Sequence, residues 1–211
     1  MTGRQTSRLI LALCLASATA YAAEATEWNL RNDEDGVQVF TRDDPDNAHL
    51  QYRGIGIAKT SPAKVADMMH DVKGMSQWLY NSYDFELLEE YGPDSRLLRM
   101  KVRTPMVVQE RDLVLTQTFE KISDLEVIVH LEGKPDAVEI DPDYVRIPYF
   151  KGTWHLLQDA ASGVTTIELM GQVDPGGAIP TFVSNAMLTE TPWQNVRAVR
   201  ALSETGENPY W

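Results

Sequence analysis

The residue best suited to chemistry in this sequence is Arg111. It lies in the segment 104–114 (TPMVVQERDLV) and opens an alternating strand pattern that continues beyond this segment. With a period of two, the face that carries the arginine also carries apolar and amide side chains: Leu113, Leu115, Gln117 and Phe119. A buried guanidinium needs a carboxylate, a water-filled hollow or a ligand head group, because burying a bare charge is costly. The pattern therefore predicts either a charged group that faces an apolar cavity or an arginine at a strand end that turns to solvent.

The other residue types that commonly do chemistry form no catalytic or metal-binding pattern. The four histidines are dispersed, and no two of them have the spacing that places two imidazoles on one helical face for zinc. No nucleophile elbow, phosphate-binding glycine loop or dinucleotide fingerprint occurs. Residues 32–36 (NDEDG) hint at a calcium loop, but Arg42 occupies the position of the closing glutamate. The sequence predicts no catalytic residue, no metal and no cofactor, which favours a binding protein over an enzyme.

Residues 1–22 are predicted to be a cleaved signal peptide, and residues 23–211 a single domain. Arg4 and Arg8 precede an apolar run over residues 9–18, and Ala20 and Ala22 are small residues at the two positions that a signal peptidase reads. The run is shorter than the about 20 apolar residues that a membrane-spanning helix needs. We therefore expect an exported protein, located in a bacterial periplasm or secreted.

The composition of the predicted mature chain is that of an acidic domain without cysteine. Cys14 is the only cysteine and lies in the predicted leader, which excludes a disulfide from the mature protein. Loss of the two leader arginines takes the formal net charge from −12 to about −14. Such a surface argues against a nucleic-acid partner and against docking on anionic lipid through general electrostatics. We expect a monomer.

A series of strands must position Arg111. The sequence predicts a short helix over residues 24–31, strands over about 37–42 and 48–58, and a helix opened by Ser61 as N-cap and Pro62 as first helical residue. From about residue 83 to 174, alternating runs separated by glycine and proline predict a meander of antiparallel strands. Each strand has one apolar face, which includes Leu98, Met100 and Val102, then Val127, Val129 and Leu131, then Ile167, Leu169 and Val173.

The last element is a predicted helix over about residues 178–202, with Phe182, Ala186 and Trp193 on one side. Pro192 lies inside it and predicts a kink or a break near Leu188, with two helices meeting at the proline as the alternative. A curved sheet that packs its apolar face against this helix encloses either a ligand-sized hollow or a solid core.

Taken together, these segments resemble the START family, the lipid-transfer domains related to steroidogenic acute regulatory protein. The resembling pieces follow family order from about residue 28 to 202: residues 36–42 (GVQVFTR), 52–57 (YRGIGI) leading into 61–62, Trp78, 111–114 (RDLV), 152–154 (GTW) and 174–180 (DPGGAIP). The resemblance implies an α+β helix-grip fold, in which a curved antiparallel β-sheet wraps around a long C-terminal α-helix and leaves an internal hydrophobic cavity.

The resemblance also implies a binding site. The family's arginine looks into the tunnel and often pairs with a carboxylate; by motif this arginine is Arg111, and Asp84 lies nearest the carboxylate position. Alternation with Tyr83 and Phe85 points Asp84 outward, unless the strand begins later or carries a bulge. The predicted ligand-binding set adds apolar positions to these two residues: Leu98, Met100, Val102, Leu113, Leu115, Phe119, Ile167, Leu169, Phe182 and Ala186.

The predicted function is to bind a single lipid, sterol-like or other hydrophobic molecule for transfer, storage or sensing, with transient contact to a membrane. Apolar contacts would provide affinity, and Arg111 would select a polar or anionic head group. A gate is expected between the final helix near Pro192 and the loop 138–143. Two alternatives stay open: an enzyme of the cyclase or hydrolase type in the same cavity, and a protein-interaction module with a solid core.

Overall fold

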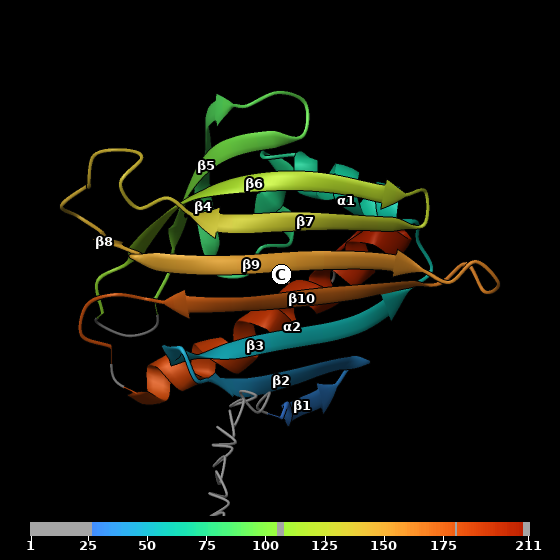
Figure 1. Ribbon diagram of the computed structural model, residues 1–211, viewed down its shortest axis with the longest axis horizontal. Helices are drawn as coiled ribbons and strands as arrows, with labels where there is room; N and C mark the ends of the chain where they lie inside the picture. The colour runs from blue at the N-terminus through green and yellow to red at the C-terminus, as the bar shows by residue number, and fades with distance from the viewer. Residues whose placement is uncertain (1–26, 105–107, 180, 209–211) are drawn as a thin grey trace, which may run out of the picture.

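The computed structural model of the protein describes residues 27–104, 108–179 and 181–208, except for the side chains at 181–183, 185 and 186. The predicted leader therefore lies outside the described residues. The strands form one sheet in the order β1-β2-β3-β10-β9-β7-β6-β5-β4, and β8 pairs with β6 off this path (Figure 1). The strands are β1 (Asn29–Glu34), β2 (Val37–Asp44), β3 (Asn47–Ala58), β4 (Ser82–Glu90), β5 (Ser95–Val102), β6 (Arg111–Ser123), β7 (Glu126–Gly133), β8 (Val145–Arg146), β9 (Tyr149–Gln158) and β10 (Thr165–Asp174).

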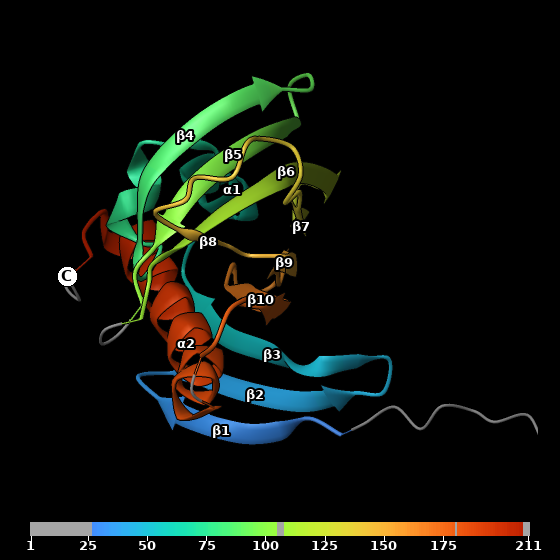
Figure 2. The ribbon, with the colours of Figure 1, turned by 90° about the vertical axis from the view of Figure 1, so that its left-hand side faces the viewer.

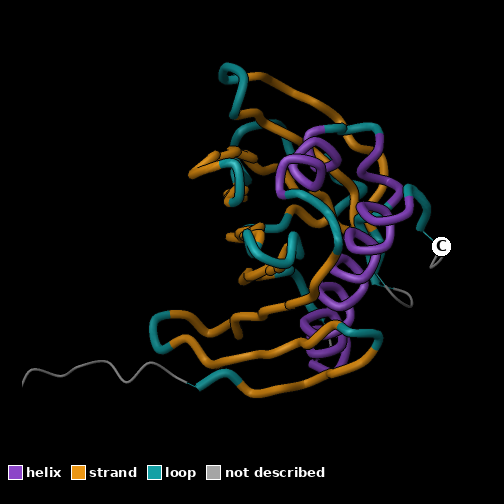
Figure 3. Tube along the Cα trace, turned by 90° about the vertical axis from the view of Figure 1, so that its right-hand side faces the viewer, coloured by secondary structure: helices purple, strands orange, loops and turns teal. Residues whose placement is uncertain are grey.

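The sheet curves around the long helix α2 (Thr181–Thr205), which lies on its concave side (Figure 2). The short helix α1 (Pro62–His70) and the turn η1 (Gly74–Gln77) cover the same side of the sheet. In Figure 3 the two helices lie together beside the curved strands. All the ladders along the path are antiparallel; β8 is parallel to β6. The predicted α+β helix-grip fold is confirmed.

Helix α1 begins where the sequence predicted and is fastened at its end by a strand residue. Ser61 Oγ accepts a hydrogen bond from the Lys64 N–H at 3.2 Å, with Pro62 at the first helical position. At the other end, Arg96 on β5 donates to the carbonyls of Met69 (2.8 Å) and His70 (2.6 Å). A cation at the negative end of the helix dipole joins α1 to the sheet.

Helix α2 continues through Pro192 without interruption, so a break and the two-helix alternative are wrong. It packs closely against β3, because a Cβ atom at Gly56 would lie 2.9 Å from Val196 Cγ1. Arg200 then donates to the carbonyls of Ile57 (2.7 Å) and Asp35 (2.6 Å). These contacts fix the C-terminal half of the helix across the first strands of the sheet.

The beginning of the domain differs from the prediction. Residues 29–31 belong to β1, so the helix predicted over 24–31 is wrong for the part that the structure describes. Asp35 and Gly36 both have positive φ (52° and 69°), which is the conformation of a tight hairpin turn between β1 and β2. Strand β1 lies at the edge of the sheet and is mostly exposed, so its sequence lacks the alternation of a half-buried strand.

Among the described residues, no helix is both long and apolar enough to cross a membrane. The core forms between the concave face of the sheet and the helices, with Val37, Val65, Met69, Leu156 and Val196 fully buried.

Candidate ligand-binding cavity

A cavity of about 140 Å³, measured as the space open to the centre of a water-sized sphere, lies between the sheet and α2. One water molecule needs only about 10–15 Å³ by this measure, so the interior is not filled by side chains. The sheet contributes most of the wall. Six residues of the predicted set line the cavity: Leu98, Met100, Val102, Leu113, Leu115 and Leu169. The solid-core alternative is therefore wrong for this interior.

The other apolar residues of the predicted set lie elsewhere or outside the description. Ile167 is fully buried in the core and does not line the cavity. Phe119 packs under α1, with its ring centroid 5.2 Å from that of His70 and the Arg96 guanidinium 5.6 Å away. The side chains of Phe182 and Ala186 are outside the described ones.

Arg111 is buried, so the alternative in which it turns to solvent is wrong, but it does not line the cavity. Its guanidinium donates to three backbone carbonyls: Gln109, Pro175 (3.3 Å) and Gly176 (3.1 Å). It forms no ion pair with a carboxylate of the described residues, and burial lowers its pKa. Arg111 therefore holds the turn that leads into α2, and its predicted role as a head-group selector inside the cavity lacks a structural basis.

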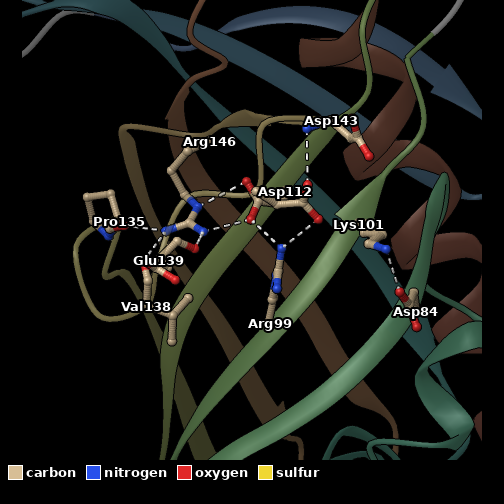
Figure 4. A network of polar contacts seen from close by, with 10 residues as sticks. Asp84, Arg99, Lys101, Asp112, Pro135, Val138, Glu139, Asp143 and Arg146 are labelled. Atoms are coloured by element: carbon tan, nitrogen blue, oxygen red, sulfur yellow. Dashed lines mark hydrogen bonds and ion pairs between the residues drawn. The ribbon is translucent and has the colours of Figure 1, made fainter.

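Asp84 is not the partner of Arg111. Its side chain is 61% exposed, and its carboxylate pairs with Lys101 at 2.8 Å on the outside of the sheet (Figure 4). The strand does contain irregular pairing between Tyr83 and Glu86, and Asp84 has a φ of 53°. The bulge nevertheless leaves the carboxylate outward, as plain alternation predicted, so the Asp84–Arg111 pair is wrong.

The carboxylate that is buried is the neighbouring residue, Asp112, which the sequence analysis did not single out. Its oxygens accept from Arg146 Nε (3.0 Å) and Nη2 (2.8 Å), and Arg99 lies 3.2 Å away (Figure 4). Arg146 also donates to the carbonyls of Pro135, Val138 (3.2 Å) and Glu139 (3.1 Å). This network fastens the segment between β7 and β8 to the outer side of β6.

The cavity is apolar with a small number of neutral polar groups. None of the described residues that line it is charged. Gln117 is among them, and its Oε1 accepts two bonds from Arg96, at 2.9 and 2.7 Å. Tyr52 also lines it, and burial strongly raises the pKa of its hydroxyl. The Tyr52 side chain lies against Gly171, where a Cβ atom would clash with its hydroxyl and ring.

Helix α2 and the segment after η1 supply the remaining polar wall. Asn195 and Thr191 come from α2, and the segment after η1 contributes Trp78, Tyr80, Asn81 and Ser82. Trp78 stacks edge-on against Trp154, with ring centroids 5.9 Å apart. Sequence reasoning missed Asn195, although a lone amide one turn after Thr191 on the buried side of a helix is a recognisable signal.

A second cavity of about 200 Å³ adjoins the first. The two share three wall residues, Val173, Met187 and Leu188. The outer part of the second cavity is formed by Ala48, which is exposed, and by His49, which pairs with Asp174 at 3.4 Å. Residues of the predicted gate loop 138–143 line neither cavity.

The fold and the apolar interior define a helix-grip domain with an internal cavity. Among solved structures, a STAR-related lipid transfer protein from Xanthomonas axonopodis is 29% identical and superposes with a TM-score of 0.75, covering 82% of this chain and 97% of that one. The human StAR-related lipid transfer protein 5 shares the fold at 17% identity, with a TM-score of 0.73 over 87% of this chain and 89% of its own.

Sequence comparison gives the family. The START domain model matches residues 12–205, so the chain belongs to the START domain family. The uncharacterized protein PA1579 of Pseudomonas aeruginosa is 30% identical over 201 residues, which cover 93% of this chain and 98% of that protein. The predicted family resemblance is confirmed.

Proposed function

We propose that the protein binds one lipid or lipid-like small molecule in the cavity between the sheet and α2, for transfer, storage or sensing. The observation that carries this proposal is an interior space walled by apolar side chains and free of charge among the described residues. Each methylene moved from water into such a wall contributes about 0.8 kcal/mol, so a short alkyl chain provides several kcal/mol. Membership of the START domain family and the lipid transfer proteins among the structural relatives support the same assignment.

We propose that the ligand enters through the second cavity. Val173, Met187 and Leu188 separate the two spaces, and flexible methionine and leucine side chains can rearrange without unfolding the strand. The exposed position of Ala48 marks the surface end of this route. The loop 138–143 is a weaker candidate, because Arg146 and Arg99 fasten it to the outer face.

The binding proposal is tested by native mass spectrometry of the protein purified without detergent, followed by organic extraction. We expect a co-purified hydrophobic molecule at one per protein. Leu169→Trp places an indole in the cavity and should abolish the bound mass, whereas Leu157→Trp, at a position 44% exposed, should retain it. Equal occupancy in both variants would contradict the cavity as the site. An extracted molecule that is unchanged supports carriage, and a chemically modified one supports an enzyme.

The entry route has its own test. Ala48→Trp obstructs the outer end of the second cavity without touching the inner one, so ligand association and dissociation should both slow at unchanged equilibrium affinity. Leu157→Trp is again the control. Exchange rates equal to those of the unmodified protein would refute this route.

We further propose that the protein works as an exported monomer. The support is the signal-peptide pattern of residues 1–22 and the acidic composition. Cell fractionation should recover a shortened chain outside the cytoplasm, and light scattering should give the mass of one copy. A full-length cytoplasmic chain would contradict the first part, and a dimer the second.

A further inference from the structure

The buried side of α2 presents an amide to the ligand cavity. Asn195 lies one helical turn after Thr191, lines the cavity with it, and is 5% exposed. A buried amide in an otherwise apolar wall is costly unless its donors and acceptor are paired. The donors of this amide that stay unpaired therefore indicate which polar group a ligand in the cavity would carry.

One hydrogen bond fixes the orientation of this amide. The backbone N–H of Tyr80 donates to Asn195 Oδ1 at 2.7 Å, which identifies the oxygen because an N–H cannot donate to the NH₂ group. Within the part of the chain that the structure describes, this is the only hydrogen bond of the Asn195 side chain. Both hydrogens of Nδ2 are consequently unpaired at the cavity wall.

The same wall holds a second unpaired donor. The indole N–H of Trp78 is buried and has no hydrogen-bond partner among the residues that the structure describes. The obvious acceptor in the wall is already occupied, because Gln117 Oε1 accepts two bonds from Arg96. A ligand that pairs with these two donors, Asn195 Nδ2 and Trp78 Nε1, must bring an acceptor.

The charge of the lining limits what that acceptor can be. No described lining residue is charged, and the two nearby guanidiniums of Arg96 and Arg111 are engaged by carbonyls and by the Gln117 amide. A carboxylate or phosphate in this cavity would be buried without a counter-charge, which costs far more than a neutral acceptor.

We infer that the cavity selects an uncharged hydrophobe that carries a carbonyl-type acceptor, and that Asn195 Nδ2 donates to this acceptor. The inference rests on the proposed function and adds the chemical class of the ligand. Asn195 acts as a specificity-determining residue, with Trp78 Nε1 as a second donor in the wall.

The test compares three probes of equal chain length: methyl decyl ketone, dodecane and dodecanoate. Each is delivered from cyclodextrin to the delipidated protein, and equilibrium competition gives the ratios of their dissociation constants. We expect the ketone to bind about tenfold more tightly than dodecane, the gain of one buried hydrogen bond, and more tightly than dodecanoate. Asn195→Leu should reduce the ketone-to-dodecane ratio about tenfold, toward unity.

The ratio separates recognition from structural support. Loss of the Tyr80 contact in Asn195→Leu would weaken all three probes together and leave the ratio unchanged. The matched control is Gln194→Leu on the same helix, whose amide pairs with Glu190 and Arg197 and does not line the cavity. If Asn195→Leu fails to fold, Trp78→Phe removes the indole donor together with part of the ring; the lost volume acts on all three probes, so the lost donor should still lower the ketone-to-dodecane ratio about threefold.

The outcomes are distinct. Equal affinities of the unmodified protein for ketone and dodecane, or tighter binding of dodecanoate, would overturn this inference and leave the proposed function intact. A ratio that does not change in Asn195→Leu would overturn the role of that residue. Retention of none of the three probes would overturn the proposed function itself.

Discussion

The two sides of β6 satisfy their buried charges in different ways. On the side that continues into the cavity wall, Arg111 pairs with no carboxylate of the described ranges and is held by the carbonyls of Gln109, Pro175 and Gly176. On the opposite side, Asp112 is fully buried between two arginines. Adjacent residues of one strand thus anchor two different loops, and neither presents its charge to the cavity. The lesson is that charged side chains here organise the scaffold, while the ligand space is left to neutral groups.

The largest effect is expected when the buried carboxylate is removed. Asp112→Ala leaves Arg146 and Arg99 without their shared partner, and we expect a loss of about 3–5 kcal/mol in the free energy of unfolding. Denaturant titration measures it. The double variant Asp112→Leu with Arg146→Met removes both charges and should recover most of the loss. A single variant as stable as the unmodified protein would show that the network carries no stability.

Substitution on the Arg111 side of β6 should lower the stability less. Arg111→Met loses three hydrogen bonds to carbonyls that water can partly satisfy, so we expect a loss of about 2–3 kcal/mol in the same titration. Because Arg111 does not line the cavity, the relative affinities for dodecanoate and methyl decyl ketone should stay the same. A selective loss of dodecanoate binding would restore the head-group role that the sequence predicted.

The packing of the cavity wall can be tested by adding side-chain volume at Gly171. Gly171→Ala introduces a methyl group where the Tyr52 side chain lies, so the ring must move into the cavity. We expect a loss of about 1–2 kcal/mol in unfolding free energy and weaker ligand binding. Combining it with Tyr52→Phe removes the closest atom and should recover part of both. Additive losses in the double variant would contradict the contact.

The smallest effect is expected on the outer surface. Asp84→Asn removes an exposed ion pair with Lys101, and asparagine tolerates the positive φ at this position. The unfolding midpoint and the ligand affinity should not change measurably. A large decrease in the unfolding midpoint or in the ligand affinity would indicate that Asp84 does contribute to the binding site.

The sequence was sufficient for the fold because its strongest signals are local. Alternation across β5, β6 and β10, the serine cap before Pro62 and the order of the family motifs each depend on neighbouring residues. Strand β1 was missed because an exposed edge strand does not need an apolar face. The six predicted residues that line the cavity all lie on strands whose inward face could be assigned by period.

The polar half of the site could not be predicted in the same way. Two of the three carbonyls that hold Arg111, those of Pro175 and Gly176, come from a turn about 65 residues further along the chain, and nothing in the RDLV pattern shows that direction. The amide of Asn195 is oriented by a backbone N–H that lies 115 residues earlier in the sequence. Such pairings follow from tertiary packing, and only the apolar surroundings of the amide on α2 gave a hint.

The ladder between β3 and β10 has a consequence for how the chain acquires its shape. It pairs Ala58 with Thr165 and Gln51 with Gln172, so the early strands join the rest of the sheet only when the tenth strand is available. During synthesis the first hairpins emerge with an unpaired edge, and contacts between such distant segments make folding slow, in milliseconds to seconds. A ribosome-bound chain that ends before β10 should therefore remain sensitive to protease, and sheet closure should coincide with the arrival of the last strand.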